Sequence, residues 1–143
     1  MSIHYRAAEK LLYTYPVNLM HWHEAVKEYM RICGETDCHG QSYEQSQDTG
    51  DHSDPPCDYV ARKQKAEQEI KKYGGLTRGI SLLRQELRGS NDERLGVMLQ
   101  VMELYYFEGM SMKDLAMHLR KNERTLYRRR EELVKEVMKL SNF

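Results

Sequence analysis

The residues with the clearest chemistry are arginines near the end of the chain. Arg124 and Arg128 are four positions apart, so any helix that contains both presents them on one face. A guanidinium group carries several N–H donors in one plane, which suits a phosphate group or the two acceptors on the edge of guanine. The pair therefore predicts contact with nucleic acid.

Apolar residues define the helix that must carry these arginines. At 100° per residue, four of them fall in one narrow arc: Leu126, Leu133, Val137 and Leu140. Arg124, Arg128 and Lys135 lie almost opposite that arc, and Thr125 and Tyr127 lie at its two margins. With the apolar arc in the core, Arg124 and Arg128 would face outward near the N-terminal end of the helix. In DNA-binding helix-turn-helix proteins that end enters the major groove.

The preceding residues predict the rest of a helix-turn-helix over 111–140. Ser111 and Asp114 have the spacing of a capping box, which marks a helix start. Ala116 supplies the small side chain needed where two helices cross closely. The short polar turn at 120–122 ends on Asn122, a good N-cap for the next helix.

This segment supplies the candidate DNA-binding residues. They are Arg120, Lys121, Asn122, Glu123, Arg124, Thr125, Tyr127, Arg128 and Arg129. We expect Arg124 and Arg128 to contact bases or phosphates with help from Thr125 and Tyr127, whereas Arg120, Lys121 and Arg129 hold phosphates. Glu123 has two interpretations, as an acceptor from a cytosine amino group or as a favourable charge at the helix N-terminus.

Charge is distributed unevenly along the chain of 143 residues, although the formal net charge is zero. Residues 111–143 contain nine Lys or Arg and five Asp or Glu, whereas residues 1–110 contain thirteen and seventeen. A basic end on an otherwise acidic chain is expected where that end meets phosphates.

A second group of reactive side chains lies in the middle of the chain: Cys33, Cys38, His39, His52 and Cys57. Their spacing matches no standard zinc-ligand pattern, and the odd number of cysteines argues against a disulfide framework. Nothing nearby supplies an oxyanion site or an orienting group for a Cys–His nucleophile. We therefore expect neither a metal nor another cofactor, and we do not expect an enzyme.

The elements that position these residues are predicted to be all α-helical, because apolar residues recur at helical spacing and alternating β-branched stretches are missing. Residues 1–33 are expected to form a helical pair broken at Pro16 and closed by Gly34. Residues 34–59 contain no Lys or Arg and read as an acidic flexible linker. Residues 60–143 are expected to form a helical DNA-binding domain.

Two interruptions are expected within this last domain. Gly74–Gly75 should interrupt its first helix. Ser90 and Glu93 should form a capping box that starts the helix before the helix-turn-helix.

Several stretches resemble a known family. Residues 106–111, 114–116 and 124–129 are similar to region four of the sigma factors, and more so to the RinA/ArpU-type late-gene regulators of phages and prophages. Residues 9–16 resemble the N-terminal helix of those regulators, and 53–55 resemble their polar middle. The resemblance implies a transcriptional regulator that activates late operons by binding upstream DNA.

Double-stranded DNA is thus the expected partner, with RNA polymerase and a second copy of the chain as further candidates. Two alternatives stay open: a small DNA-recognition subunit of a phage packaging terminase, which would form rings of large mass, and a sigma-like module that docks on RNA polymerase. The N-terminus lacks the apolar core of a signal peptide, and no apolar run reaches membrane-spanning length. We expect a cytoplasmic, nucleoid-associated protein of a bacterial host cell.

Overall fold

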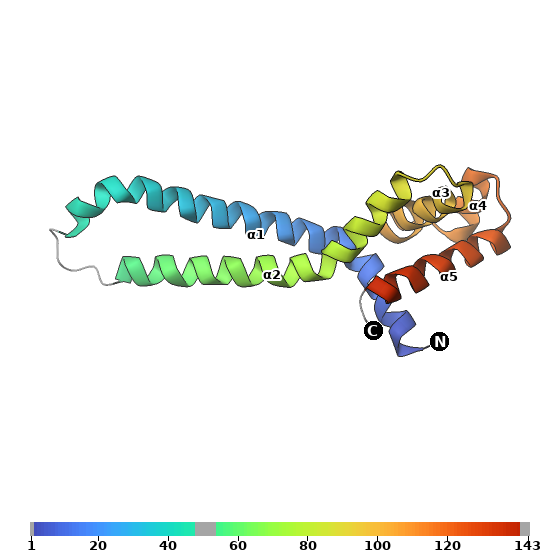
Figure 1. The fold of residues 1–143 in the computed structure, drawn as a ribbon, viewed down its shortest axis with the longest axis horizontal. Coiled ribbons are helices and arrows are strands. Elements are labelled where there is room, and N and C mark those ends of the chain that lie inside the picture. The colour runs from blue at the N-terminus through green and yellow to red at the C-terminus, as the bar shows by residue number, and fades with distance from the viewer. Residues whose placement is uncertain (1, 48–53, 141–143) are drawn as a thin grey trace. The chain divides into compact units, whose positions relative to one another are not determined.

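A computed structural model describes the backbone of residues 2–47 and 54–140 and the side chains of 2–34 and 58–140. All its regular elements are helices (Figure 1), so the predicted all-α class is confirmed. In chain order they are α1 (Ile3–Gln47), α2 (Asp54–Arg88), α3 (Glu93–Gln100), the π-helix η1 (Val101–Phe107), α4 (Met112–Leu119) and α5 (Glu123–Leu140). Among the helices so described, none has both the length and the apolar character needed to cross a membrane.

The chain divides into two compact units. The main unit comprises Met1–Asn18 and Leu76–Phe143, and the hairpin unit comprises Leu19–Gly75. These boundaries differ from the predicted ones, which divide the chain into three segments: 1–33, 34–59 and 60–143. The difference arises because α1 and α2 are long helices that each contribute residues to both units.

The first helix is longer than predicted. It continues through Pro16, where the sequence predicts a break. Leu12 and Tyr15 are buried before this proline and Ala25 after it, so packing on both sides offsets the roughly 3 kcal/mol that an interior proline costs. The helix also continues through Gly34 and Gly40 to Gln47, because each glycine costs a helix only about 1 kcal/mol.

The predicted linker is therefore helical wherever its backbone is described. Residues 34–47 belong to α1 and 54–59 to α2. Residues 48–53 lie outside the described part of the chain, as do the side chains of Cys38, His39, His52 and Cys57.

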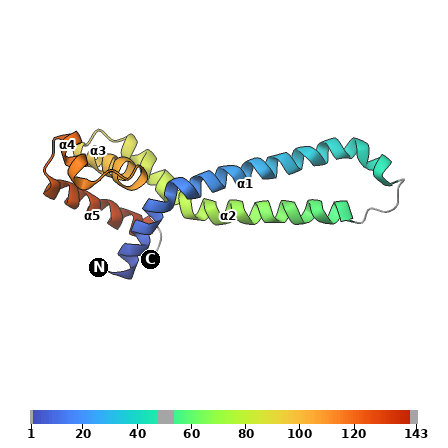
Figure 2. The same cartoon turned by 180° about the vertical axis from the view of Figure 1, so that it is seen from behind.

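In the hairpin unit, α1 and α2 run side by side in opposite directions (Figures 1 and 2). Trp22 packs closely on Gly74, where a Cβ atom would lie 3.2 Å from the indole Nε1. The residues that precede Trp22 and Gly74, His21 and Tyr73, also contact each other, with ring centroids 5.0 Å apart. α2 runs unbroken through Gly74–Gly75, so the predicted interruption is wrong. At Gly74 the missing side chain makes room for an indole ring rather than ending the helix.

The main unit has a core made by every one of its helices. Its most deeply buried side chains are Ala8, Leu12, Ile80, Met98, Val101, Met102, Leu115, Leu126, Leu133, Val134 and Val137. Three of the four apolar residues predicted to face inward from α5 do so. The fourth, Leu140, is 45% exposed at the last position of the helix.

The start of α3 also differs from the prediction. Ser90 is not its N-cap; that position belongs to Asp92, whose carboxylate accepts a hydrogen bond from the Arg94 backbone N–H at 2.9 Å. The Ser90 hydroxyl instead accepts from the Asp92 N–H at 3.1 Å. A carboxylate nearer the helix gives the stronger cap, because its charge also meets the positive end of the helix dipole.

Candidate nucleic-acid interface

Two short-range hydrogen bonds fix the N-terminal ends of α4 and α5. The Ser111 hydroxyl accepts from the Asp114 N–H at 3.1 Å, and Asn122 Oδ1 accepts from the Arg124 N–H at 3.0 Å. Both predicted N-caps are therefore confirmed. The buried Ala116 lies on α4, which packs against α5. The segment thus has the predicted order of helix, short turn and helix.

The turn itself depends on Arg120, which closes α4 in the left-handed conformation with φ 55° and ψ 44°. The next residue, Lys121, donates its backbone N–H to the Ala116 carbonyl at 3.0 Å, which completes the helix end. In the described part of the chain, Arg120 is the single non-glycine residue with positive φ. This conformation costs an arginine about 1 kcal/mol, and such strained residues cluster at functional sites.

The outward face of α5 carries the two arginines with which the sequence argument began. Arg124 and Arg128 are both exposed, while Leu126 and Leu133 on the other side of the helix are fully buried. None of the ion pairs between described residues involves Arg124 or Arg128. Both guanidinium groups are therefore available to an external acceptor.

The remaining candidates on this surface differ in exposure. Tyr127 is 49% exposed, Glu123 is exposed and Thr125 is half-buried. Glu123 is the first residue of α5. A negative charge at this position stabilises a helix, which is the second of its two predicted interpretations.

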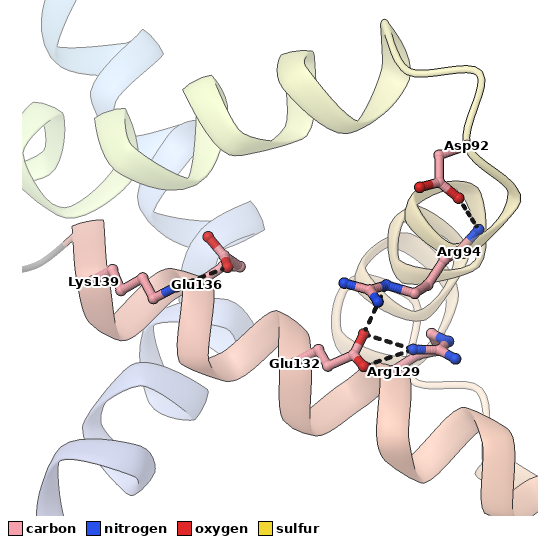
Figure 3. A network of polar contacts seen from close by, with 6 residues as sticks. All are labelled: Asp92, Arg94, Arg129, Glu132, Glu136 and Lys139. Carbon is pink, nitrogen blue, oxygen red and sulfur yellow. Dashed lines mark hydrogen bonds and ion pairs between the residues drawn. The ribbon is translucent and has the colours of Figure 1, made fainter.

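Lys121 and Arg129 are already engaged by acids of the same chain. Lys121 Nζ lies 2.6 Å from Glu93 Oε1, and its hydrogen bond lowers the pKa of the Glu93 carboxyl. Arg129 Nη1 lies 2.7 Å from Glu132, whose carboxylate is also 3.5 Å from Arg94 Nε (Figure 3). A phosphate would have to compete with these carboxylates for both predicted ligands.

Figure 3 also shows how this acid-base cluster is built from two helices. Asp92 and Arg94 come from the start of α3, and Arg129 and Glu132 from the middle of α5. A separate exposed pair, in which Lys139 Nζ lies 3.3 Å from Glu136, stands near the end of α5. Near the turn, Lys121 and Arg129 are therefore paired with carboxylates of the same chain, whereas Arg124 and Arg128 are not.

One residue that the sequence argument did not select is central to this region. The Arg130 guanidinium lies 5.6 Å from the centre of the Tyr105 ring and 5.4 Å from that of Tyr127. It donates to the Tyr105 hydroxyl at 3.2 Å and lies 3.7 Å from Glu9. The three-residue spacing of Tyr127 and Arg130 on one helix was the available signal, whereas Glu9 and Tyr105 are distant in sequence.

Beneath Arg130 lies a polar cluster formed by α1 and η1. Tyr106, which is 3% exposed, donates its hydroxyl to Glu9 at 2.7 Å. Burial, and next the hydrogen bond to the Glu9 carboxylate, raise the pKa of Tyr106. The Tyr13 and Tyr105 hydroxyls are 3.1 Å apart, and burial with this contact raises the pKa of Tyr13. These tyrosines hold the first turns of α1 to η1.

The cysteine and histidine group remains largely outside the described side chains. Of its members, Cys33 is a half-buried free thiol in α1. Over the part of the chain with described residues, no cluster of three or more His, Cys, Asp or Glu is placed to hold a metal ion.

Comparison of the chain with protein-family models, with curated proteins and with solved structures gave no match. The candidate interface is accordingly defined by its own geometry: a capped helix, a strained turn and two exposed, unpaired arginines on α5.

Proposed function

We propose that this chain is a sequence-specific DNA-binding protein that regulates transcription, with the N-terminal half of α5 as its recognition helix. The observation that carries the proposal is the exposed and unpaired state of Arg124 and Arg128, opposite a fully buried face. A rigid helix that presents two arginines near its N-terminal end matches the way a helix-turn-helix enters the major groove.

Each exposed side chain has a role in this proposal. Arg124 and Arg128 read guanine edges or hold the phosphates beside them. Arg120, which projects from the turn, holds a phosphate that flanks the groove. Thr125 and Tyr127 contact the margins of the same site.

The regulatory part of the proposal has a different support. It comes from the resemblance of residues 106–111, 114–116 and 124–129 to sigma region four and to the RinA/ArpU-type regulators of phages and prophages. We accordingly propose activation of phage or prophage late genes from an upstream site. Two copies on a symmetric site would double the length of DNA that one short helix reads.

Selection from a randomised pool of DNA duplexes tests the proposal. The full chain is expected to enrich a defined motif and to bind it at least about 1,000-fold more tightly than a scrambled duplex at physiological salt. A pool that stays random, or equal affinity for both duplexes, would contradict it. Mass in solution separates the terminase alternative, because a large ring would count against a regulator.

Removing the acid that engages Lys121 is expected to strengthen DNA binding. Glu93→Gln frees a cation that now lies 2.6 Å from a carboxylate. If the freed Lys121 reaches a phosphate, affinity should rise about threefold and the slope of log K against log[salt] should steepen by about 0.9. Fluorescence anisotropy with the selected duplex across a salt series measures both quantities.

Glu136→Gln is the matched control, because it makes the same charge change at an exposed pair near the other end of α5. It should leave the salt slope unchanged. Equal slopes for the two variants would show that Lys121 holds no phosphate.

Relieving the strain at Arg120 should separate stability from binding. Glycine and asparagine both tolerate the left-handed conformation that Arg120 adopts. Arg120→Gly and Arg120→Asn are thus expected to unfold at no lower urea concentration than the natural chain, yet to bind the selected duplex about threefold to tenfold more weakly. Unchanged DNA affinity in both variants would remove Arg120 from the interface.

A further inference from the structure

Arg130 differs from Arg124 and Arg128 because it faces the protein. Its side chain is 17% exposed, and that of Glu9, its ionic partner, is 16% exposed. The guanidinium group contacts two aromatic rings, one from η1 and one from its own helix. Its charge is thus already matched by a carboxylate and by two ring faces.

The second of those rings belongs to Tyr127, which lies at the margin of the proposed recognition face. About half of its surface is exposed. An exposed tyrosine on a helix can occupy more than one rotamer unless something holds its ring. The guanidinium, 5.4 Å from the ring centre, lies on one face of the tyrosine and leaves the remainder open to solvent.

Arg130 is itself anchored from the opposite side. The Glu9 carboxylate that faces it also accepts the Tyr106 hydroxyl at 2.7 Å. The Tyr105 hydroxyl accepts from Arg130 Nη1 at 3.2 Å. The guanidinium contacts Glu9 on α1 and Tyr105 on η1. It therefore cannot follow Tyr127 into a different rotamer without breaking these two contacts.

We propose that Arg130 is a positioning residue that fixes the Tyr127 ring on the DNA-facing side of α5 and does not itself touch DNA. This inference rests on the proposed function. It assigns the half-buried Arg130 a different task from that of the exposed Arg128 in the same basic run. A phosphate-binding role would require Arg130 to leave Glu9 and both tyrosine rings.

Salt dependence distinguishes positioning from phosphate contact. Arg130→Met is expected to weaken binding to the selected duplex about fivefold to tenfold while the salt slope stays unchanged. A slope reduced by about 0.9 would identify a phosphate contact and overturn the proposal. Lys139→Met removes the same charge from the exposed end of α5 and is the matched control.

A double-mutant cycle tests whether Arg130 acts through Tyr127. In a Tyr127→Leu background, Arg130→Met should have almost no further effect on affinity. If the affinity losses of the two single variants multiply in the double variant, the two residues act independently and the proposal is overturned. Arg130→Lys should restore part of the affinity, since an ammonium group keeps the charge but lacks the planar surface. If Arg130→Met fails to fold, Arg130→Lys supplies the same cycle with a smaller loss in the same direction.

A measurement without DNA keeps the inference distinct from the proposed function. The NMR resonances of the Tyr127 ring should shift in Arg130→Met and stay in place in Lys139→Met. Unshifted Tyr127 resonances would overturn the positioning role even if the natural chain binds DNA. If the ring shifts but the natural chain selects no duplex, the proposed function has failed and the DNA-positioning role with it, while the contact itself stands.

Discussion

Replacing Arg124 and Arg128 together with methionine is expected to weaken binding to the selected duplex by at least about 30-fold, because each guanine contact contributes about 1–3 kcal/mol. Methionine keeps the unbranched stem and the helix propensity of arginine, and both positions are exposed. The free energy of unfolding should therefore change little. Anisotropy titration and urea unfolding of the same preparation measure the two quantities.

A charge-matched control separates recognition from general attraction to DNA. Lys65→Met with Lys139→Met removes the same two charges from exposed positions outside the proposed interface. That variant should lose less than about threefold in affinity, since neither lysine belongs to the side chains assigned to bases or phosphates. Similar losses in both double variants would show that α5 has no recognition face.

The second large effect concerns the support of that face. Leu133→Ala is expected to lower the free energy of unfolding by about 2–5 kcal/mol, because a fully buried leucine leaves a cavity in the core. Urea unfolding followed by circular dichroism measures the loss. The variant should also bind DNA more weakly at temperatures near its midpoint of unfolding.

Leu140→Ala is the control for this prediction. It makes the same truncation on the same helix at a side chain that is 45% exposed. Its cost should stay below about 1 kcal/mol. Equal losses for the two variants would mean that the buried side of α5 has been assigned wrongly.

The parts of the fold that could be predicted from sequence depend on short-range signals. Asn122 and Ser111 cap helices through hydrogen bonds to residues two and three positions away. The inward placement of Leu126 and Leu133 follows from helical spacing alone. Such features need no knowledge of distant segments.

The parts that could not be predicted depend on distant partners. Pro16 would end an isolated helix, yet α1 continues because residues on both sides of it are buried. Gly74 has the composition of a helix breaker, and its role is visible only once Trp22 lies against it. In each case tertiary packing outweighs a local preference.

The candidate site divides in the same way. Exposure of Arg124 and Arg128 follows from the angle between residues on one helix. Pairing of Lys121 with Glu93, and of Arg130 with Glu9, joins residues far apart in sequence. A count of basic residues therefore overestimates the free positive charge, because it treats paired and unpaired cations alike.

Methylation interference tests the central claim most directly, because methylation of guanine N7 blocks the acceptor that an arginine uses in the major groove. The natural chain is expected to lose binding when the guanines of the selected motif carry this methyl group. Methylation of adenine N3, in the minor groove, should have little effect. Binding that survives N7 methylation at every guanine of the motif would contradict recognition of the major groove by Arg124 and Arg128.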